Sequence, residues 1–246
     1  MTAPHVERIT DNLGLVAGDL EMARIEDELS EQWPKCLDGQ KRAFRVTSLF
    51  HRTLVLAAQE RGADVVLIDV GPNLGAINRT AVIASDFIGV PLAPELYSLQ
   101  GLRNLGPTLR AWRGGWSERL QKAPDKSLAL PKGDMKPIRY VLMQHAVRYD
   151  RPVQPYNRWA EKVPAQYQAS LLNGDMEPPK HQASDPNCLA LLKHYRSLMP
   201  MSMEAHKPMF HLRPADGAIG AHSEAVARCY EDFENLARKI MFATGC

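Results

Sequence analysis

The strongest constraint on the fold is a short apolar run that ends on a carboxylate and then breaks. In DVVLIDVGPNLG, residues 64–75, the β-branched run Val65–Ile68 leads to Asp69 and then to Gly71 and Pro72. A run of this length between breakers is typical of a buried parallel strand. Open α/β sheets bind ligands at the carboxyl ends of such strands. Asp69 is therefore a candidate ligand-binding carboxylate, although it could equally just end the strand and cap the next turn.

A second strand–loop–helix signal begins at residue 87. In FIGVPLAPELYSLQGL, residues 87–102, an apolar run is followed by a loop with two prolines and then by a helical pattern. The pattern predicts a strand over Ile88–Pro91 and a helix over Leu99–Trp112 that ends at Gly114-Gly115. Strands that alternate with helices in this way indicate a parallel, doubly wound sheet.

Together, these two segments resemble the ParA/MinD family of deviant P-loop ATPases. Members carry a strand ending in Asp before a Pro/Gly turn, then a Pro-x-x-Pro-Glu loop and a Tyr-x-Leu-x-Gly-Leu helix start. The positions in step are Asp69, Gly71, Pro72, Pro91, Pro94, Glu95, Tyr97, Leu99, Gly101 and Leu102. Weaker similarity in Tyr140–Gln144 and Glu204–Phe210 extends the resemblance over residues 55–240.

The resemblance implies an ATP site with Mg²⁺. Asp69 would be the catalytic carboxylate and would hold Mg²⁺ through water, and the turn after it would sense the γ-phosphate. The implied cofactor-binding positions are Gly71, Pro72, Pro94, Glu95, Met143, Gln144, Arg213, Pro214 and Asp216. The loop that holds the last three resembles one that packs against adenine. From the residues alone, Asp216 could also be only the N-cap of the final helix.

The family's phosphate-binding loop, of the type KGGxGK[ST], does not occur in this sequence. That loop cradles the phosphates with its amides and lysine, so we expect ATP and Mg²⁺ binding to be weak or absent. Two interpretations stay open. Either Met1 is an internal start within a longer ATPase, or the protein is shortened and has lost hydrolysis. The intact later motifs favour the first.

We expect one ParA-like α/β domain over residues 1–246, incomplete at its N-terminus and lacking the first strand and the phosphate loop. A Pro-rich excursion lies around 173–187, and a surface loop lies over 122–137. The predicted strands are Leu13–Val16, Val65–Ile68, Ile88–Pro91 and Ile138–Met143. The predicted helices are Ala43–Arg61, Gly75–Ala84, Leu99–Trp112, Arg158–Leu172, Leu189–Leu198 and Ala218–Phe242. The last is the C-terminal helix at 218–242.

Composition bounds the setting of the protein. The chain is 45% apolar and 24% charged with a net charge of +2, which is average for a globular protein. No apolar run reaches the roughly 18 residues of a membrane span. The four cysteines, at 36, 188, 229 and 246, are scattered. That spacing fits a reducing compartment, so we expect a cytoplasmic protein.

Charge is uneven along the chain. Residues 101–160 hold twelve bases and four acids, a balance of +8, whereas residues 1–31 have a balance of −6. The basic region could contact DNA without sequence preference, or it could be an ordinary solvated surface. In the loop over residues 148–152, an arginine could meet a phosphate or simply pair with Asp150.

The expected function is that of a ParA-like partitioning or positioning ATPase core, a homodimer gated by ATP. Because the lysines and amides that stabilise transferring charge are absent, we expect little or no hydrolysis from these residues. The alternative is a non-catalytic interaction module that dimerises or docks on a partner protein or DNA.

Overall fold

The computed structural model describes residues 4–125, 127–145, 147–148, 151–152, 158–172 and 181–246. By its internal contacts the chain divides into two compact units. The first comprises residues 1–88 and 107–136, and the second comprises residues 89–106 and 137–246. The expectation of a single domain stays a prediction.

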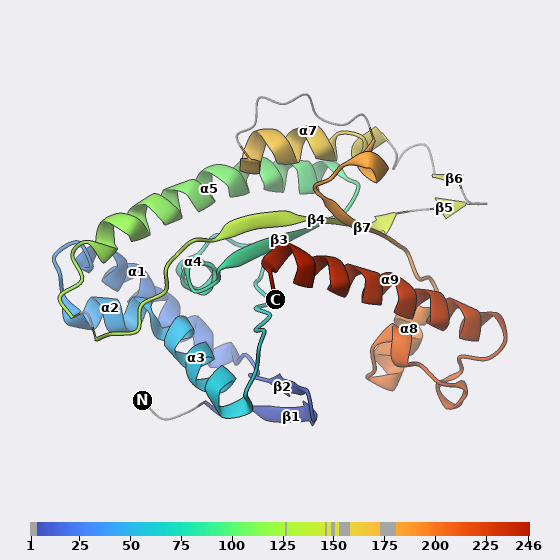
Figure 1. Ribbon diagram of the computed structural model, residues 1–246, viewed down its shortest axis with the longest axis horizontal. Helices are drawn as coiled ribbons and strands as arrows, with labels where there is room; N and C mark the ends of the chain where they lie inside the picture. Colours follow the sequence, from blue (N-terminus) through green and yellow to red (C-terminus); the bar gives the residue numbers. More distant parts are fainter. Residues whose placement is uncertain (1–3, 126, 146, 149–150, 153–157, 173–180) are drawn as a thin grey trace. The chain divides into compact units, whose positions relative to one another are not determined.

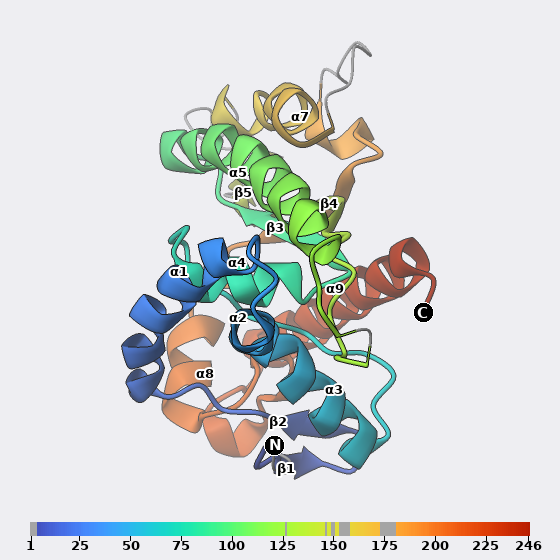
Figure 2. The same ribbon diagram turned by 90° about the vertical axis from the view of Figure 1, so that its left-hand side faces the viewer.

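The first unit opens with a hairpin and continues with helices. Strand β1 (Glu7–Thr10) pairs antiparallel with β2 (Leu13–Leu15). A 3₁₀ turn, η1 (Leu20–Arg24), leads into α1 (Ile25–Lys35), and α2 (Lys41–Thr47), α3 (Leu49–Arg61) and α4 (Ala76–Ile83) follow. Figure 2 shows these helices grouped, with α1 beside α4. The predicted strand at Leu13–Val16 therefore exists, but in a hairpin.

The helix predicted over Ala43–Arg61 is interrupted at Ser48. The Ser48 hydroxyl donates to the carbonyl of Phe44 at 2.7 Å, a local bond that competes with regular helix geometry. The predicted end of the helix is confirmed. Gly62 adopts a left-handed conformation with φ of 60°, which glycine reaches without steric cost.

The core of the first unit forms around Trp116. Its ring lies 6.1 Å from the ring of Phe44 and is stacked at 6.0 Å on the ring of Trp33. The guanidinium groups of Arg119 and Arg79 lie over Trp33, at 3.9 and 4.5 Å from the ring centre. Burial, and secondarily the charge of Arg119, lower the pKa of Arg79. The aromatic faces offset part of the cost of burying two cations.

This packing explains why α5 (Leu96–Leu120) is longer than predicted. The helix runs through Gly114 and Gly115 instead of ending there. Each glycine costs about 1 kcal/mol in a helix interior. The next turn holds Trp116, which is fully buried and donates from its indole nitrogen to the carbonyl of Pro131 at 2.9 Å. Tertiary burial therefore outweighs local propensity.

The second unit contains a three-stranded sheet in the order β3–β4–β7. Its strands are β3 (Phe87–Leu92), whose first two residues count with the first unit, β4 (Lys136–His145) and β7 (Cys188–Lys193). β4 and β7 are parallel, with Tyr140 opposite Cys188. Figure 1 shows the three strands side by side. The predicted strands at 88–91 and 138–143 are thus confirmed.

Residues 189–198 are not the predicted helix. Most of this segment is β7, and α8 (Leu198–Ala205) begins only at its end. A short apolar run has no periodicity that separates a strand from a buried helix. Pairing with β4 decides the structure.

The remaining helices flank this sheet or follow it. The helix predicted over Arg158–Leu172 is interrupted near Pro164, which begins α7 (Val163–Tyr167), and a π-helical turn, η2 (Gln168–Leu172), follows. α7 lies along the first half of α5, where Arg103 donates to Gln166 at 2.8 Å (Figure 1). The C-terminal helix α9 (Ala221–Thr244) confirms the helix predicted over 218–242. The smaller elements are β5 (Val147–Arg148), β6 (Arg151–Pro152), η3 (Gln182–Ser184), η4 (Met209–His211) and η5 (Pro214–Asp216).

A buried hydrogen bond ties β4 to the start of β7. The hydroxyl of Tyr140 donates to the carboxylate of Asp185 at 2.8 Å, and both side chains are buried. Burial, followed by this carboxylate, raises the pKa of Tyr140 far above its ordinary value. The phenol therefore stays protonated and keeps the buried carboxylate paired.

Candidate functional site

The segment that was predicted to carry the site is extended but unpaired. Within the described part of the chain, Val65–Ile68 takes part in no strand pairing, so the prediction of a buried strand is wrong. Val65, Val66 and Leu67 are exposed, Leu67 to 84%, and Ile68 is half-buried. A β-strand is defined by backbone hydrogen bonds to a neighbouring strand, and no described segment pairs with this one. Asp69 is exposed at its end.

The turn after Asp69 is ordered by one asparagine. The side-chain amide of Asn78 donates to the carbonyls of Gly71 and Asn73, at 2.7 Å each. The carboxamide oxygen of Asn73 in turn accepts from the amide of Gly75 at 3.0 Å. The exposed Gly71 and Pro72 thus sit in a turn whose backbone is held from α4.

A carboxylate from a distant segment caps the N-terminus of α4. The two carboxylate oxygens of Glu26, on α1, accept from the amides of Ala76 and Ile77 at 2.5 and 2.8 Å. Gly75 precedes the helix and has no side chain to cap it. Free amides at a helix start attract anions, and here the protein supplies the anion itself. Sequence reasoning missed Glu26, because nothing local links it to residues 50 positions away.

The loop between β3 and α5 has the predicted form. Pro94 is buried, whereas Glu95 is exposed at the start of the helix. The hydroxyl of Ser98 accepts from the amide of Ala93 at 3.0 Å, which fixes the turn. Tyr97 is 81% exposed. The loop thus presents a carboxylate and an aromatic ring to solvent.

Two further candidates lie on β4. Met143 is 39% exposed near the end of the strand, and Gln144 follows it in the strand. The side chain of Gln144 lies outside the described residues, and so do Tyr149 and Asp150 of the loop over 148–152.

The last candidates, Arg213, Pro214 and Asp216, lie in a loop in which Lys207 holds Asp216. Asp216 accepts from the Nζ atom of Lys207 at 2.7 and 2.9 Å and from the amide of Arg213 at 2.9 Å. The bond from Lys207, followed by that amide, lowers the pKa of Asp216. The proposal that Asp216 is the N-cap of the final helix is wrong. α9 begins after Gly220 because the chain first forms the 3₁₀ turn η5.

A cavity of about 550 Å³ lies beside this loop. It is lined by Lys207, Phe210, His211, Leu212 and Arg213. An aromatic ring, an imidazole and the guanidinium of Arg213 suit a flat, anionic ligand, whereas the charge of Lys207 is already paired with Asp216. The sequence predicted Arg213 here but not Phe210 or His211.

The residues present do not form a phosphate cradle. The amides of the helix start that follows Asp69 are already taken by Glu26. Within the described ranges, no three His, Cys, Asp or Glu side chains are grouped so that they could hold a metal ion. The Asp69 region therefore does not fit a triphosphate with Mg²⁺ by its own residues. Asp69, Gly71 and Pro72 belong to the first unit and the other candidates to the second.

None of the helices in the described part of the chain combines the length and the apolar character that crossing a membrane requires.

The class of protein follows from the fold. The chain is a mixed α/β protein with a parallel sheet and flanking helices, as the sequence predicted. A crystal structure of the protein DIP2308 from Corynebacterium diphtheriae has a TM-score of 0.58 to it at 18% sequence identity. The match covers 94% of this chain and 66% of that one, and it shows a shared fold.

Sequence comparison narrows the class. Residues 4–122 match the family model described as an AAA domain. The chromosome-partitioning ATPase Soj of Thermus thermophilus is 35% identical over 65 residues, 26% of either chain. Protein IncC of Escherichia coli is 30% identical over 93 residues, 38% of this chain and 25% of that one. The chromosome partitioning protein ParA of Caulobacter vibrioides is 29% identical over 110 residues, 44% of this chain and 37% of that one.

Parts of the chain are therefore similar to ParA-type partitioning proteins, and the resemblance found in the sequence is confirmed. The matches cover between 25% and 37% of the length of these three relatives.

Proposed function

We propose that this protein works in partitioning or positioning, as a ParA-type homodimer whose assembly is coupled to nucleotide. The similarity to Soj and ParA supports the process. The Asp69 turn and the Pro94–Glu95 loop are both held by hydrogen bonds, which supports the proposal that the protein uses a ParA-type arrangement of these segments. The proposed location is the cytoplasm.

The proposed nucleotide contacts divide into two groups. In a longer form that supplies a phosphate loop, Asp69 would face Mg²⁺ through water, with Gly71 and Pro72 in the turn that senses the γ-phosphate. Pro94, Glu95, Met143, Gln144, Arg213, Pro214 and Asp216 would lie on the side of the base. The cavity beside Arg213 supports this second group, because Phe210 offers an aromatic ring and the exposed Arg213 a positive charge.

Such a site lacks a phosphate-binding loop, so we expect little or no hydrolysis by these residues alone. Contacts to the base side only are worth roughly 4–5 kcal/mol, which corresponds to high micromolar binding or weaker. Isothermal titration of the full chain with ATP and Mg²⁺ measures this. A dissociation constant in the low micromolar range would mean that another segment replaces the phosphate loop.

Asp69 can be tested in any longer form that carries a phosphate loop. There, Asp69→Asn and Asp69→Ala should abolish hydrolysis, since both remove the carboxylate proposed to face the metal. Turnover near that of the wild type would remove Asp69 from the metal site and leave it as the end of an extended segment.

The second candidate function is a non-catalytic module that dimerises or docks on a protein or DNA. One observation favours it: Glu26 already neutralises the helix start that follows the Asp69 turn. The DNA upstream of the Met1 codon distinguishes the two. An in-frame KGGxGK[ST] coding run supports the ATPase, and an in-frame stop supports the module.

DNA binding is proposed for the basic region 101–160, with its balance of +8. Mobility-shift titrations of unrelated duplexes should then give similar affinities that fall steeply with salt. Binding that is absent at low salt would leave the basic region as a solvated surface.

A further inference from the structure

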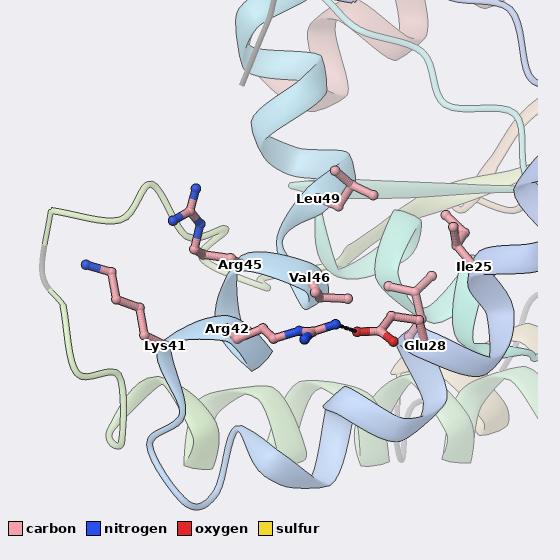
Figure 3. A pocket seen from close by; sticks show the side chains of 8 residues that line it. Ile25, Glu28, Lys41, Arg42, Arg45, Val46 and Leu49 are labelled. Atoms are coloured by element: carbon pink, nitrogen blue, oxygen red, sulfur yellow. Dashed lines mark hydrogen bonds and ion pairs between the residues drawn. The ribbon is translucent and has the colours of Figure 1, made fainter.

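An apolar groove lies between α1 and the α2–α3 segment of the first unit, with a cavity volume of about 580 Å³. We call it the α1–α2 groove. Its apolar lining consists of Ile25, Leu29, Val46 and Leu49. Figure 3 labels three of them, Ile25, Val46 and Leu49. Ile25 and Leu29 come from α1 and Val46 and Leu49 from the α2–α3 segment, and Leu29 is 1% exposed. The groove is large enough to bury two or three branched apolar side chains.

The rim of the groove is positively charged. Lys41, Arg42 and Arg45 line it from α2, against the single acid Glu28 from α1. Figure 3 shows Arg42 reaching across to Glu28, and the two charges are 3.0 Å apart. Lys41 pairs with Asp125 at 2.6 Å. Arg45 is exposed and forms no ion pair with any described residue. The α2 edge therefore carries an uncompensated positive charge.

The form of the groove selects a helix over a small molecule. Small-molecule sites usually enclose the ligand and aim a few polar groups at it. Here the apolar base carries no polar group, and none of the described residues that line it is aromatic. All the charges lie at the solvent edge, where Arg42 is 76% exposed. Such a layout matches the docking of an amphipathic helix, with apolar anchors spaced by three or four residues.

We propose that the α1–α2 groove docks an acidic amphipathic helix of a partner protein. Two or three branched apolar side chains fill the base, and Glu or Asp side chains along one flank face the α2 edge. Charge complementarity carries this assignment, because a basic helix would meet the uncompensated charge of Arg45 there, whereas Lys41 and Arg42 are paired with Asp125 and Glu28. The inference does not depend on nucleotide binding or on the proposed function.

The test is an unbiased selection. A phage-displayed library of helical 16-residue peptides is selected on the full 246-residue chain, and the enriched peptides are synthesised with a fluorescent label. We expect a consensus of apolar residues at i, i+3 or i+4 and i+7, flanked by Glu or Asp. Anisotropy titrations at low salt then measure affinity for the wild type and for variants.

Arg45→Glu should weaken the selected peptides about fivefold or more, because it replaces an attraction by a repulsion. Leu49→Gln, which places an amide in the apolar base, should weaken them as well. Arg196→Glu is the matched control. It makes the same change of charge at an exposed arginine of the second unit, and affinity should stay within about twofold. Circular dichroism confirms that each variant is folded.

Four results would overturn the proposal. They are no enriched consensus, a basic or uncharged consensus, affinity that is unchanged by Arg45→Glu, and a dimer in light scattering that Arg45→Glu dissociates. The last result would assign the groove to a second copy of this chain.

Discussion

Replacing Glu26 by alanine should destabilise the start of α4. The carboxylate is the only described acceptor for the amides of Ala76 and Ile77, which it meets at 2.5 and 2.8 Å. Ala76 is 3% exposed, so water reaches its amide poorly. After the substitution, two donors at a helix start lose their partner, and the positive end of the helix dipole loses a compensating charge.

The magnitude follows from the kind of contact. Loss of an N-cap acceptor costs about 0.5–2 kcal/mol, and a hydrogen bond to a charged group contributes about 1.5–3 kcal/mol. These ranges describe the same contact and do not add, so we expect about 2 kcal/mol for Glu26→Ala. Glu26→Gln keeps one acceptor oxygen but loses the charge, and it should cost about 1 kcal/mol.

Urea denaturation followed by circular dichroism measures the free energy of unfolding, and hydrogen exchange reports on the two amides themselves. Glu31→Ala is the control, since Glu31 lies on the same helix but pairs only with Lys35 at the surface, and it should change stability far less. If Glu26→Ala stays within about 0.5 kcal/mol of the wild type, like an ordinary surface change, Glu26 does not hold the helix start.

Three further predictions concern other parts of the chain. The exposed, unpaired segment 65–68 should make the isolated chain poorly soluble or oligomeric, as measured by size-exclusion chromatography with light scattering and by hydrogen exchange. Gly133→Ala should cost at least about 2 kcal/mol, because φ is 71° and the new Cβ would lie 2.3 Å from the Cδ1 atom of Trp116. Because Lys207 lowers the pKa of Asp216 from its ordinary value of 3.8, this pair should stabilise the fold above that pH and lose its contribution as the pH falls below it. Acid unfolding of Lys207→Met measures the difference.

Each of these predictions has a contrary outcome. A stable 27.5 kDa monomer with strongly protected amides at 65–68 would mean that this segment is paired. Gly62→Ala is the control for Gly133→Ala, since its φ is 60° but no atom lies within 4 Å of the new Cβ. Equal losses of stability for the two variants would mean that the clash with Trp116 does not contribute to the cost of Gly133→Ala. If Lys207→Met unfolds in acid with the same pH dependence as the wild type, the Lys207–Asp216 pair does not stabilise the fold.

Features that depend on neighbouring residues could be predicted from the sequence. The loop after β3 was one, because prolines exclude regular structure and the helical pattern restarts at once. The left-handed end of α3 at Gly62 was another, since glycine alone adopts that conformation without cost. At the candidate site, the same reasoning predicted the turn after Asp69, whereas the Arg213 loop was named from the family resemblance.

Features that depend on partners distant in the sequence could not be predicted from it. An apolar run becomes a strand only when another strand pairs with it, so Cys188–Lys193 joins β4 whereas Val65–Ile68 stays unpaired. α5 continues through two glycines because Trp116 is buried beyond them. Glu26 caps a helix 50 residues away, and no local pattern records such a contact. The sequence by itself determined the proline loop after β3 and the glycine end of α3, because those signals are local. Only the tertiary structure decided which segments pair, since pairing and burial belong to two segments at once.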